Sequence, residues 1–310
     1  MSHSRLLGCF ALLLWSSVAS SCSPTPRVGQ VDPAARAPAS QPQIALLIRT
    51  DDAGMSHSVN MGMERLIKSG LPVSVSVMVP TPWYQETVEI LKRYPAVSVG
   101  IHLTLNSEWK NYRWGPVLGR TAVPTLVDAE GYFFPSADAL RKNSPNLQEV
   151  ERELRAQIER ARRSGVRIDY VDYHMGTAVQ YPDFREITER VAREFGLGMS
   201  HYFGETTHDP QYAAAPQSKL DSLLVMVDRL QPGVNMVITH VGIDDAELGA
   251  LVDMNTSFPL PDMSKHRQGE LDALTSQRFT DALQARNIRL ITYRQLIDMH
   301  GLHAMRRPAE

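Results

Sequence analysis

Cysteine is nearly absent from this 310-residue chain, in which only Cys9 and Cys22 occur, both near the N-terminus. The rest of the chain therefore has neither a disulfide framework nor a thiolate metal site, and any metal ion there must be bound by nitrogen and oxygen. A surplus of positive charge is absent too, since the formal net charge is -2, so we expect no nucleic-acid partner. A chain of this length forms one large α/β domain, or at most two small ones, with a full core.

The N-terminal apolar run, Leu6–Trp15, is too short for a membrane span. Arg5 precedes it and small residues follow it, which is typical of a signal peptide. The small residues before Cys22 indicate a lipoprotein signal, in which that cysteine receives lipid after cleavage, although Ala19 stands where leucine is usual. The alternative is ordinary cleavage near Ala19–Ser21, which leaves Cys22 as a free thiol.

Residues 23–43 are rich in proline, alanine, serine and glutamine and have no apolar period, which is typical of a flexible linker. We therefore expect a signal peptide at 1–22, a linker at 23–43, one domain at 44–300 and a tail at 301–310. Both cleavage alternatives predict a secreted, periplasmic or cell-envelope protein. Membrane attachment is expected only through a lipid anchor at Cys22.

Short apolar runs alternate with helical stretches from Ile44 onward. Most of the runs are continuously apolar, as expected for strands buried on both faces of a parallel sheet. The predicted strands are Ile44–Thr50, Val73–Val79, Val97–Leu103, Ile168–His174, Val234–His240 and Ile288–Thr292, with a weaker one at Leu197–Tyr202.

Helix start and stop signals fall between these strands. The predicted helices are Val59–Lys68, Trp83–Tyr94, Leu147–Ser164, Asp183–Phe195 and Gly269–Arg286. The alternation predicts an α/β fold, namely a (β/α) barrel of the TIM type that is incomplete or distorted. The stretch from Asn106 to Asn143 is too long for a plain connection, so we expect an inserted loop region over one end of the barrel.

Potential metal ligands and acids stand at the ends of four predicted strands. Asp51 and Asp52 follow the first strand, and His102, His174 and His240 end three others. In parallel α/β folds the active site lies at the carboxyl ends of the strands. Each residue alone has an ordinary explanation, as a turn, a helix cap or a hydrogen-bonded histidine. Five of them on one predicted rim favour a functional site.

Two neutral imidazoles and one carboxylate make an open site for a divalent metal ion, here His102, His174 and one of the two aspartates. The other aspartate is then free to act as a general base on water, and the spacing does not say which aspartate has which role. His240 is placed to protonate a leaving group or to stabilise an oxyanion. Asp172 shares the strand face of His174 and is expected to orient that ring.

Several motifs together resemble the YdjC-like carbohydrate deacetylase family, which includes chito-oligosaccharide deacetylases. Thr50-Asp51-Asp52-Ala53-Gly54 is similar to the family's Asp-Asp-Phe-Gly opening, and Gly100-Ile101-His102-Leu103 matches its Gly-Ile-His-Leu segment. Ile168–His174 resembles the segment in which an aspartate stands two residues before a metal-binding histidine. Thr239-His240-Val241-Gly242 resembles the late His-Pro-Gly motif. The resemblance covers essentially Ile44 to Met299.

This resemblance implies a hydrolase on a barrel-like α/β fold that uses one divalent metal ion, zinc or magnesium. The substrate it implies is an acetylated oligosaccharide, and the reaction is removal of acetyl groups, including N-acetyl groups of amino sugars. It assigns metal binding to Asp52, His102 and His174 and the role of base to Asp51. His240 would lie near the leaving group.

The chain departs from the family at Ala53 and Val241, where phenylalanine and proline are usual, and at Tyr170 and Gly176, where histidines are frequent. These changes spare the implied ligands but bear on substrate recognition. Three tryptophans are candidates for stacking on sugar rings: Trp83, Trp109 and Trp114. Two rival functions stay open, a metallo-esterase or amidase acting on a non-sugar substrate and a non-catalytic carbohydrate-binding lipoprotein.

Overall fold

The computed structural model describes residues 43–255 and 262–309. The predicted signal peptide and nearly all of the predicted linker lie outside the described residues, so both stay predictions. Within the described ranges, no helix is long and apolar enough to cross a bilayer.

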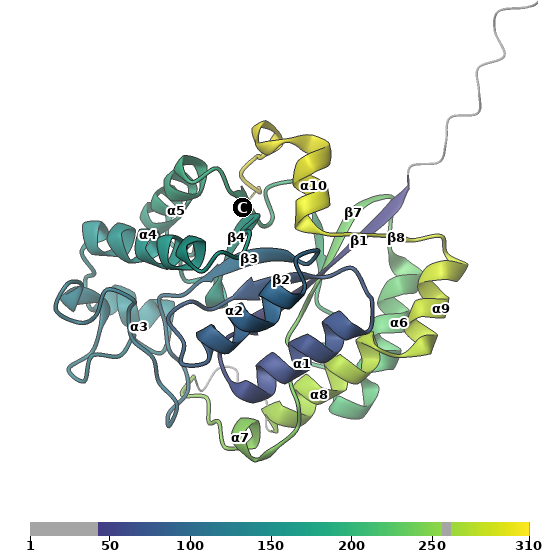
Figure 1. Ribbon diagram of the computed structural model, residues 1–310, viewed down its shortest axis with the longest axis horizontal. Helices are drawn as coiled ribbons and strands as arrows, with labels where there is room; N and C mark the ends of the chain where they lie inside the picture. The colour runs from purple at the N-terminus through teal and green to yellow at the C-terminus, as the bar shows by residue number, and fades with distance from the viewer. Residues whose placement is uncertain (1–42, 256–261, 310) are drawn as a thin grey trace, which may run out of the picture. The chain divides into compact units, whose positions relative to one another are not determined.

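Eight parallel strands form one sheet that curls into a half-barrel with helices packed around it (Figure 1). The order along the sheet is β5-β4-β3-β2-β1-β7-β6, and β8 pairs with β1. The strands are β1 (Ile44–Ala53), β2 (Ser74–Val77), β3 (Ser98–Leu103), β4 (Tyr170–Tyr173), β5 (Gly198–Met199), β6 (Thr206–His208), β7 (Gly233–Thr239) and β8 (Arg289–Ile291). This architecture confirms the predicted barrel-like α/β fold in its incomplete form.

The first strand, β1, holds the sheet together because it has three partner strands. Along one edge it pairs with β7 from Ile44 to Thr50. The other edge is divided, since Ala45–Leu47 pair with β8 and Arg49–Ala53 pair with β2. Both aspartates of the predicted site therefore stand at the end of the most extensively paired strand.

Side chains of β1 alternate between two apolar cores, as the period of a strand requires. Leu46 and Ile48 belong to the main core under the outer helices, whereas Leu47 packs into a smaller core with Met236 and Tyr293. Arg49 and Asp51 lie two and four residues after Leu47, so their side chains point to the same face of the sheet as Leu47. The inner face of the half-barrel thus changes from an apolar base to a charged layer toward the strand ends.

The outer helices, which alternate with the strands along the chain, pack against the outside of the sheet (Figure 1). They are α1 (His57–Lys68), α2 (Tyr84–Arg93), α4 (Leu147–Arg163), α5 (Pro182–Glu194), α6 (Lys219–Arg229), α8 (Met263–Leu274) and α9 (Gln277–Ala285). The last helix, α10 (Tyr293–His300), lies at the amino ends of the strands. There the backbone N–H groups of Tyr293 and Arg294 each donate to a serine hydroxyl, Ser74 of β2 and Ser98 of β3, at 3.0 Å. This helix covers that end of the half-barrel.

One helical prediction needs correction, and two elements were missed. The predicted helix Gly269–Arg286 is in fact α8 followed by α9, because the Ser276 hydroxyl accepts a hydrogen bond from the Arg278 N–H and caps a new helix. The helix α6 and the short strand β6 were not predicted from the sequence. Strand β6 is only three residues long and largely exposed, so it has no apolar run to mark it.

The inserted loop region from Asn106 to Asn143 contains only one short helix, α3 (Ala137–Lys142), and a 3-10 turn among its described elements. Its first residues pair with a later loop, since the Lys110 N–H donates to Val252 O and the Met254 N–H donates to Glu108 O, both at 2.8 Å. The insertion and the segment around Val252 therefore form one continuous wall beside the carboxyl ends of the strands.

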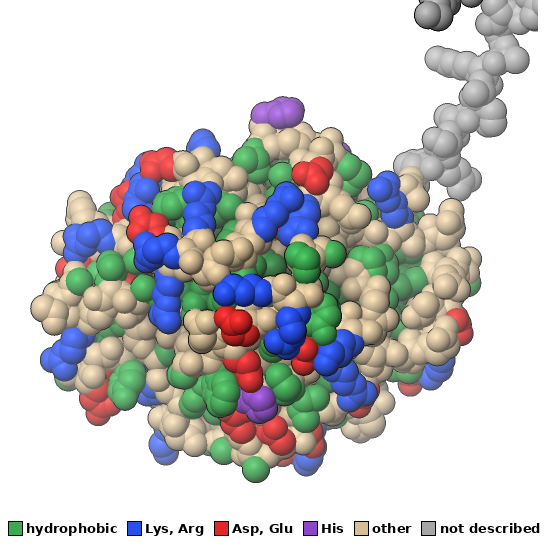
Figure 2. All heavy atoms as spheres, viewed as in Figure 1, with side chains coloured by type: hydrophobic (Ala, Val, Ile, Leu, Met, Phe, Trp, Pro, Cys, Tyr) green, Lys and Arg blue, Asp and Glu red, His purple; other side chains and the backbone are tan. Residues whose placement is uncertain are grey.

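Charged side chains of both signs are interspersed over the face shown in Figure 2. Ion pairs also join neighbouring helices, as where Glu151 of α4 contacts Arg190 of α5 at 2.5 Å. Exposed pairs of this kind contribute at most about 1 kcal/mol each. The packing of α4 and α5 therefore depends mainly on their apolar faces.

Candidate active site

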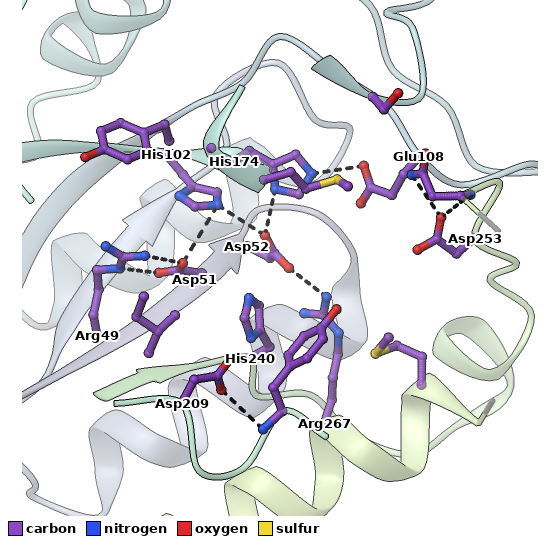
Figure 3. Close-up of a pocket in the computed structure, with 18 of the residues that line it drawn as sticks. Arg49, Asp51, Asp52, His102, Glu108, His174, Asp209, His240, Asp253 and Arg267 are labelled. Carbon is purple, nitrogen blue, oxygen red and sulfur yellow. Dashed lines mark hydrogen bonds and ion pairs between the residues drawn. The ribbon is translucent and has the colours of Figure 1, made fainter. Parts of the chain in front are cut away.

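The carboxyl ends of three strands bring four of the five predicted site residues together (Figure 3). Asp52 Oδ1 lies 3.2 Å from His174 Nδ1 and 3.5 Å from His102 Nε2. Asp51 Oδ2 lies 4.0 Å from the same His102 nitrogen. All four residues are at most 4 % exposed.

The backbone of Asp52 explains how two consecutive aspartates reach one site. Neighbouring residues of a regular strand point to opposite faces, but Asp52 has a left-handed φ of 66°. The register between β1 and β2 shifts between Thr50 and Ala53. A left-handed aspartate costs about 1–3 kcal/mol of backbone strain, so the surrounding fold must hold this conformation in place.

Asp52, His102 and His174 fit the ligand set of a divalent metal ion. Their candidate ligand atoms lie within 4.8 Å of one another, and two imidazoles with one carboxylate are ligands that transition metals accept. Asp52 Oδ1 is buried without a hydrogen-bond partner among the described residues, which is costly unless a cation satisfies it. The other oxygen, Oδ2, accepts a hydrogen bond from Arg267 at 2.6 Å.

Burial alone would raise the pKa of Asp52. The charge of Arg267 and the proximity of both histidine rings to the carboxylate outweigh this effect and hold the pKa well below its usual range. Asp52 is therefore an anion, as a metal ligand must be.

The second nitrogen of each histidine has its own carboxylate partner. His102 Nδ1 lies 3.1 Å from Asp172 Oδ1, and His174 Nε2 lies 2.9 Å from Glu108 Oε2. Burial lowers the pKa of both rings, but the carboxylates outweigh it and raise the pKa of His102 to about 10 and that of His174 to about 9. Such partners fix the orientation of a metal-binding ring.

The expectation that Asp172 orients His174 was wrong. Asp172 is paired with His102 in the register of β3 and β4, and both side chains point to the inner face. His174 lies beyond the end of β4, where the chain turns away into Met175, which has φ 49°. The sequence did not indicate Glu108, its actual partner, because that residue lies in the insertion and belongs to no periodic element.

Asp51 is held by Arg49, two residues earlier on the same strand. The guanidinium donates to both carboxylate oxygens at 2.7 Å, and its Nε also lies 3.0 Å from Asp172 Oδ2. The remaining guanidinium nitrogen donates to Ser200 at 2.6 Å. This buried arginine therefore orients the Asp51 carboxylate and links it to the partner of His102.

His240, the fifth predicted residue, lines the same cleft but does not belong to the cluster of possible metal ligands. Its backbone N–H donates to Glu270 Oε2 at 2.7 Å, and Glu270 Oε1 lies 3.2 Å from Lys219 Nζ. Its ring lies edge-on to Tyr212, with centroids 5.6 Å apart. The ion pair thus anchors the backbone of His240 while its ring faces the cleft (Figure 3).

Comparison with known proteins places this arrangement in a family. Residues 45–285 match the family described as YdjC-like protein. The chain belongs to the YdjC-like family.

Relatives of this YdjC-like protein span nearly its whole domain. It is 27 % identical to a protein of Brevibacillus brevis named carbohydrate deacetylase, over 81 % of this chain and 99 % of the relative. It is 32 % identical to a carbohydrate deacetylase of Thermus thermophilus, over 68 % of this chain and 82 % of the relative. A crystal structure from Enterococcus faecalis, described as a putative cellobiose-phosphate cleavage protein, has the same fold, with a TM-score of 0.68, 24 % identity and coverage of 82 % and 99 %.

The cleft of the YdjC-like protein is a cavity of about 560 Å³ above the charged layer. Of the three tryptophans considered for sugar stacking, Trp109 lines it but is only 3 % exposed. Trp114 is equally buried and packs edge-on against His174, with ring centroids 6.1 Å apart. Trp83 is exposed but packs against His57, outside the cleft lining. Trp109 and Trp114 therefore support the walls of the cleft, and none of the three tryptophans offers an open surface to it.

Proposed function

We propose that this protein is a metal-dependent carbohydrate deacetylase that removes acetyl groups from an acetylated carbohydrate, namely N-acetyl groups of amino-sugar oligosaccharides. Its relatives named carbohydrate deacetylase support this assignment. The observation that carries it is the convergence of Asp52 Oδ1, His102 Nε2 and His174 Nδ1 in a cleft, with Asp51 Oδ2 within 4.0 Å of one of those nitrogens.

Asp52, His102 and His174 would hold one divalent metal ion. When bound, such an ion supplies a Lewis acid that lowers the pKa of water and polarises a carbonyl group. The ligand set favours zinc, because magnesium prefers oxygen ligands. Arg267 would still donate its hydrogen bond to Asp52 Oδ2, and its charge keeps that carboxylate ionised.

Asp51 is the proposed general base, which accepts a proton from the attacking water. Its carboxylate is fixed by both hydrogen bonds from Arg49, so it needs no reorientation for the transfer. His240 is proposed to donate a proton to the departing sugar nitrogen. The hydrogen bond of its backbone N–H to Glu270 fixes the residue while its ring lines the cleft, and general acid–base groups of this kind contribute about 10²- to 10⁴-fold.

Acetate release from a panel of N-acetylated and O-acetylated oligosaccharides tests the proposal, with the protein assayed before and after removal of metal by a chelator. We expect release from amino sugars that stops with the chelator and returns with zinc. Release from non-sugar esters or amides alone would favour a metallohydrolase of another class. Metal at full occupancy without release from any substrate would favour a carbohydrate-binding protein.

A further inference from the structure

Met175 directly follows the proposed ligand His174 and lies in the lining of the cleft. Its side chain is 47 % exposed, and among the exposed large apolar side chains of the described residues it alone lines this cavity. Exposed apolar surface inside a cleft is unfavourable in water and marks a binding surface.

The backbone of Met175 is held in an unfavourable conformation. Its φ is 49°, in the left-handed region that suits glycine rather than a long side chain. Backbone strain of this kind persists only where the surrounding structure imposes it, and it concentrates at functional sites.

Asn106 holds the Met175 side chain in place. This fully buried side chain donates from Nδ2 to the Met175 sulfur at 2.9 Å, and its Oδ1 accepts from the Thr177 hydroxyl at 2.9 Å. The same Nδ2 lies 3.4 Å from Glu108 Oε2, which in turn holds His174. One buried amide therefore links the exposed thioether to the metal-ligand cluster.

We propose that Met175 is a specificity-determining residue whose thioether packs against the apolar face of the sugar ring that carries the acetyl group. The inference rests on the proposed deacetylase function. Sugar rings have an apolar face formed by C–H groups, and the cleft needs an open apolar surface for it. The tryptophans do not provide this surface, because Trp109 and Trp114 are each only 3 % exposed.

Steady-state kinetics of metal-loaded variants test the proposal with two substrates. One is an N-acetylated amino-sugar oligosaccharide, and the other is an aryl acetate, which has the acetyl group without a sugar ring. Met175→Gly should raise KM for the oligosaccharide about tenfold or more, because a buried apolar contact is lost, and should affect the aryl acetate much less. Met175→Leu keeps apolar surface and should retain most of the affinity.

Thermal unfolding separates this role from a structural one. Glycine tolerates φ 49°, and the relief of strain offsets the lost hydrogen bond from Asn106 to the sulfur, so Met175→Gly should unfold close to the wild-type temperature. Met299 provides the matched control, because it is also 47 % exposed but lies on α10, away from the cleft lining. Met299→Ala should leave the KM unchanged for both substrates.

An unchanged KM for the oligosaccharide in Met175→Gly would overturn the inference, and so would a large fall in unfolding temperature or an equal loss on both substrates. Those outcomes leave wild-type deacetylation intact. A wild-type protein that is inactive on every acetylated sugar would instead overturn the proposed function and this inference with it.

Discussion

Each proposed metal-binding histidine has one ring nitrogen toward Asp52 and the other toward a second carboxylate. Asp172 supplies that carboxylate to His102, and Glu108 supplies it to His174. A partner on the outer nitrogen fixes the ring angle and the tautomer of the inner one. The geometry of the cluster therefore depends on Glu108 although this residue comes from a loop.

Replacement of Glu108 tests that dependence. Glu108→Ala should weaken zinc binding by about 10- to 100-fold, because the His174 ring loses the partner of its Nε2. Competition with a chromophoric chelator measures the affinity. Glu130, an exposed carboxylate in the same insertion, serves as the control. Equal affinities in Glu108→Ala and wild-type protein would show that the ring is fixed by packing alone.

Metal binding should also release protons. The carboxylates around them raise the pKa of His102 to about 10 and that of His174 to about 9, so both rings carry a proton at pH 7 when no metal is bound. Metal requires the neutral rings, so we expect about two protons released per ion and an affinity that rises with pH up to about 10, the higher of the two pKa values. Calorimetry at pH 7 in buffers of different ionisation enthalpy measures this number. Metal binding without any proton release would contradict the proposed ligands.

At the scale of elements, the contact between α1 and the loop after β7 is unusually close. A Cβ atom on Gly62 of α1 would lie only 2.6 Å from the Gly242 Cα. This contact positions the loop that follows His240 against the helix that follows Asp52. Only two facing glycines allow the backbones to approach so closely.

Gly62→Ala should therefore lower the free energy of unfolding by about 1–3 kcal/mol, because the added methyl group forces α1 and the loop apart. Chemical denaturation measures the change. Gly249→Ala is the matched control, since its Cβ would meet nothing nearer than Ser264 Oγ at 3.7 Å. Equal stability of the two variants would mean that the loop shifts at no cost.

The apolar runs predicted most strands to within a few residues, because side chains on both faces of a buried strand pack into a core and the strand is therefore continuously apolar. Predicted Val97–Leu103 is β3 (Ser98–Leu103), and predicted Val234–His240 is β7 (Gly233–Thr239). Periodicity did not predict helix boundaries that depend on local hydrogen bonds. The Ser276 hydroxyl caps the start of α9 within the stretch that was predicted as one continuous helix.

For the site, the sequence indicated the strand-end residues but not their partners. Asp51, Asp52, His102 and His174 converge as predicted because parallel strands end at one edge. The partners of these residues depend on tertiary geometry. Glu108 comes from the insertion, and Arg267 reaches Asp52 across 215 positions of sequence. Neither residue stands in a pattern that periodicity can detect.

For the whole molecule, the chain enters the described domain at the end of β1 opposite the cleft. Gln43 precedes this strand at its amino end, and Asp51 lies at its carboxyl end, roughly 26 Å further along at about 3.3 Å per residue. A chain attached through its N-terminus therefore joins the domain at the end remote from the cleft. Attachment to a membrane is thus compatible with access of a large substrate.

We expect the protein to incorporate a radiolabelled fatty acid in a bacterial host and to sediment with membranes. Cys22→Ser should prevent both, because Cys22 is the proposed acceptor, and should leave acetate release unaltered. Cys9→Ser is the matched control and should still be labelled. If the wild-type protein carries no label and is found in the soluble extracellular or periplasmic fraction, ordinary signal cleavage without lipid attachment is indicated instead.

We propose separate roles for the two neighbouring aspartates, with Asp52 as metal ligand and Asp51 as base. The most direct test measures zinc content and acetate release on the same preparations of wild type, Asp51→Asn and Asp52→Asn. Asp51→Asn should keep one zinc ion per chain while its kcat falls by about 10²- to 10⁴-fold, and Asp52→Asn should lose both zinc and activity. Undiminished turnover by Asp51→Asn, or full zinc occupancy in Asp52→Asn, would contradict this division.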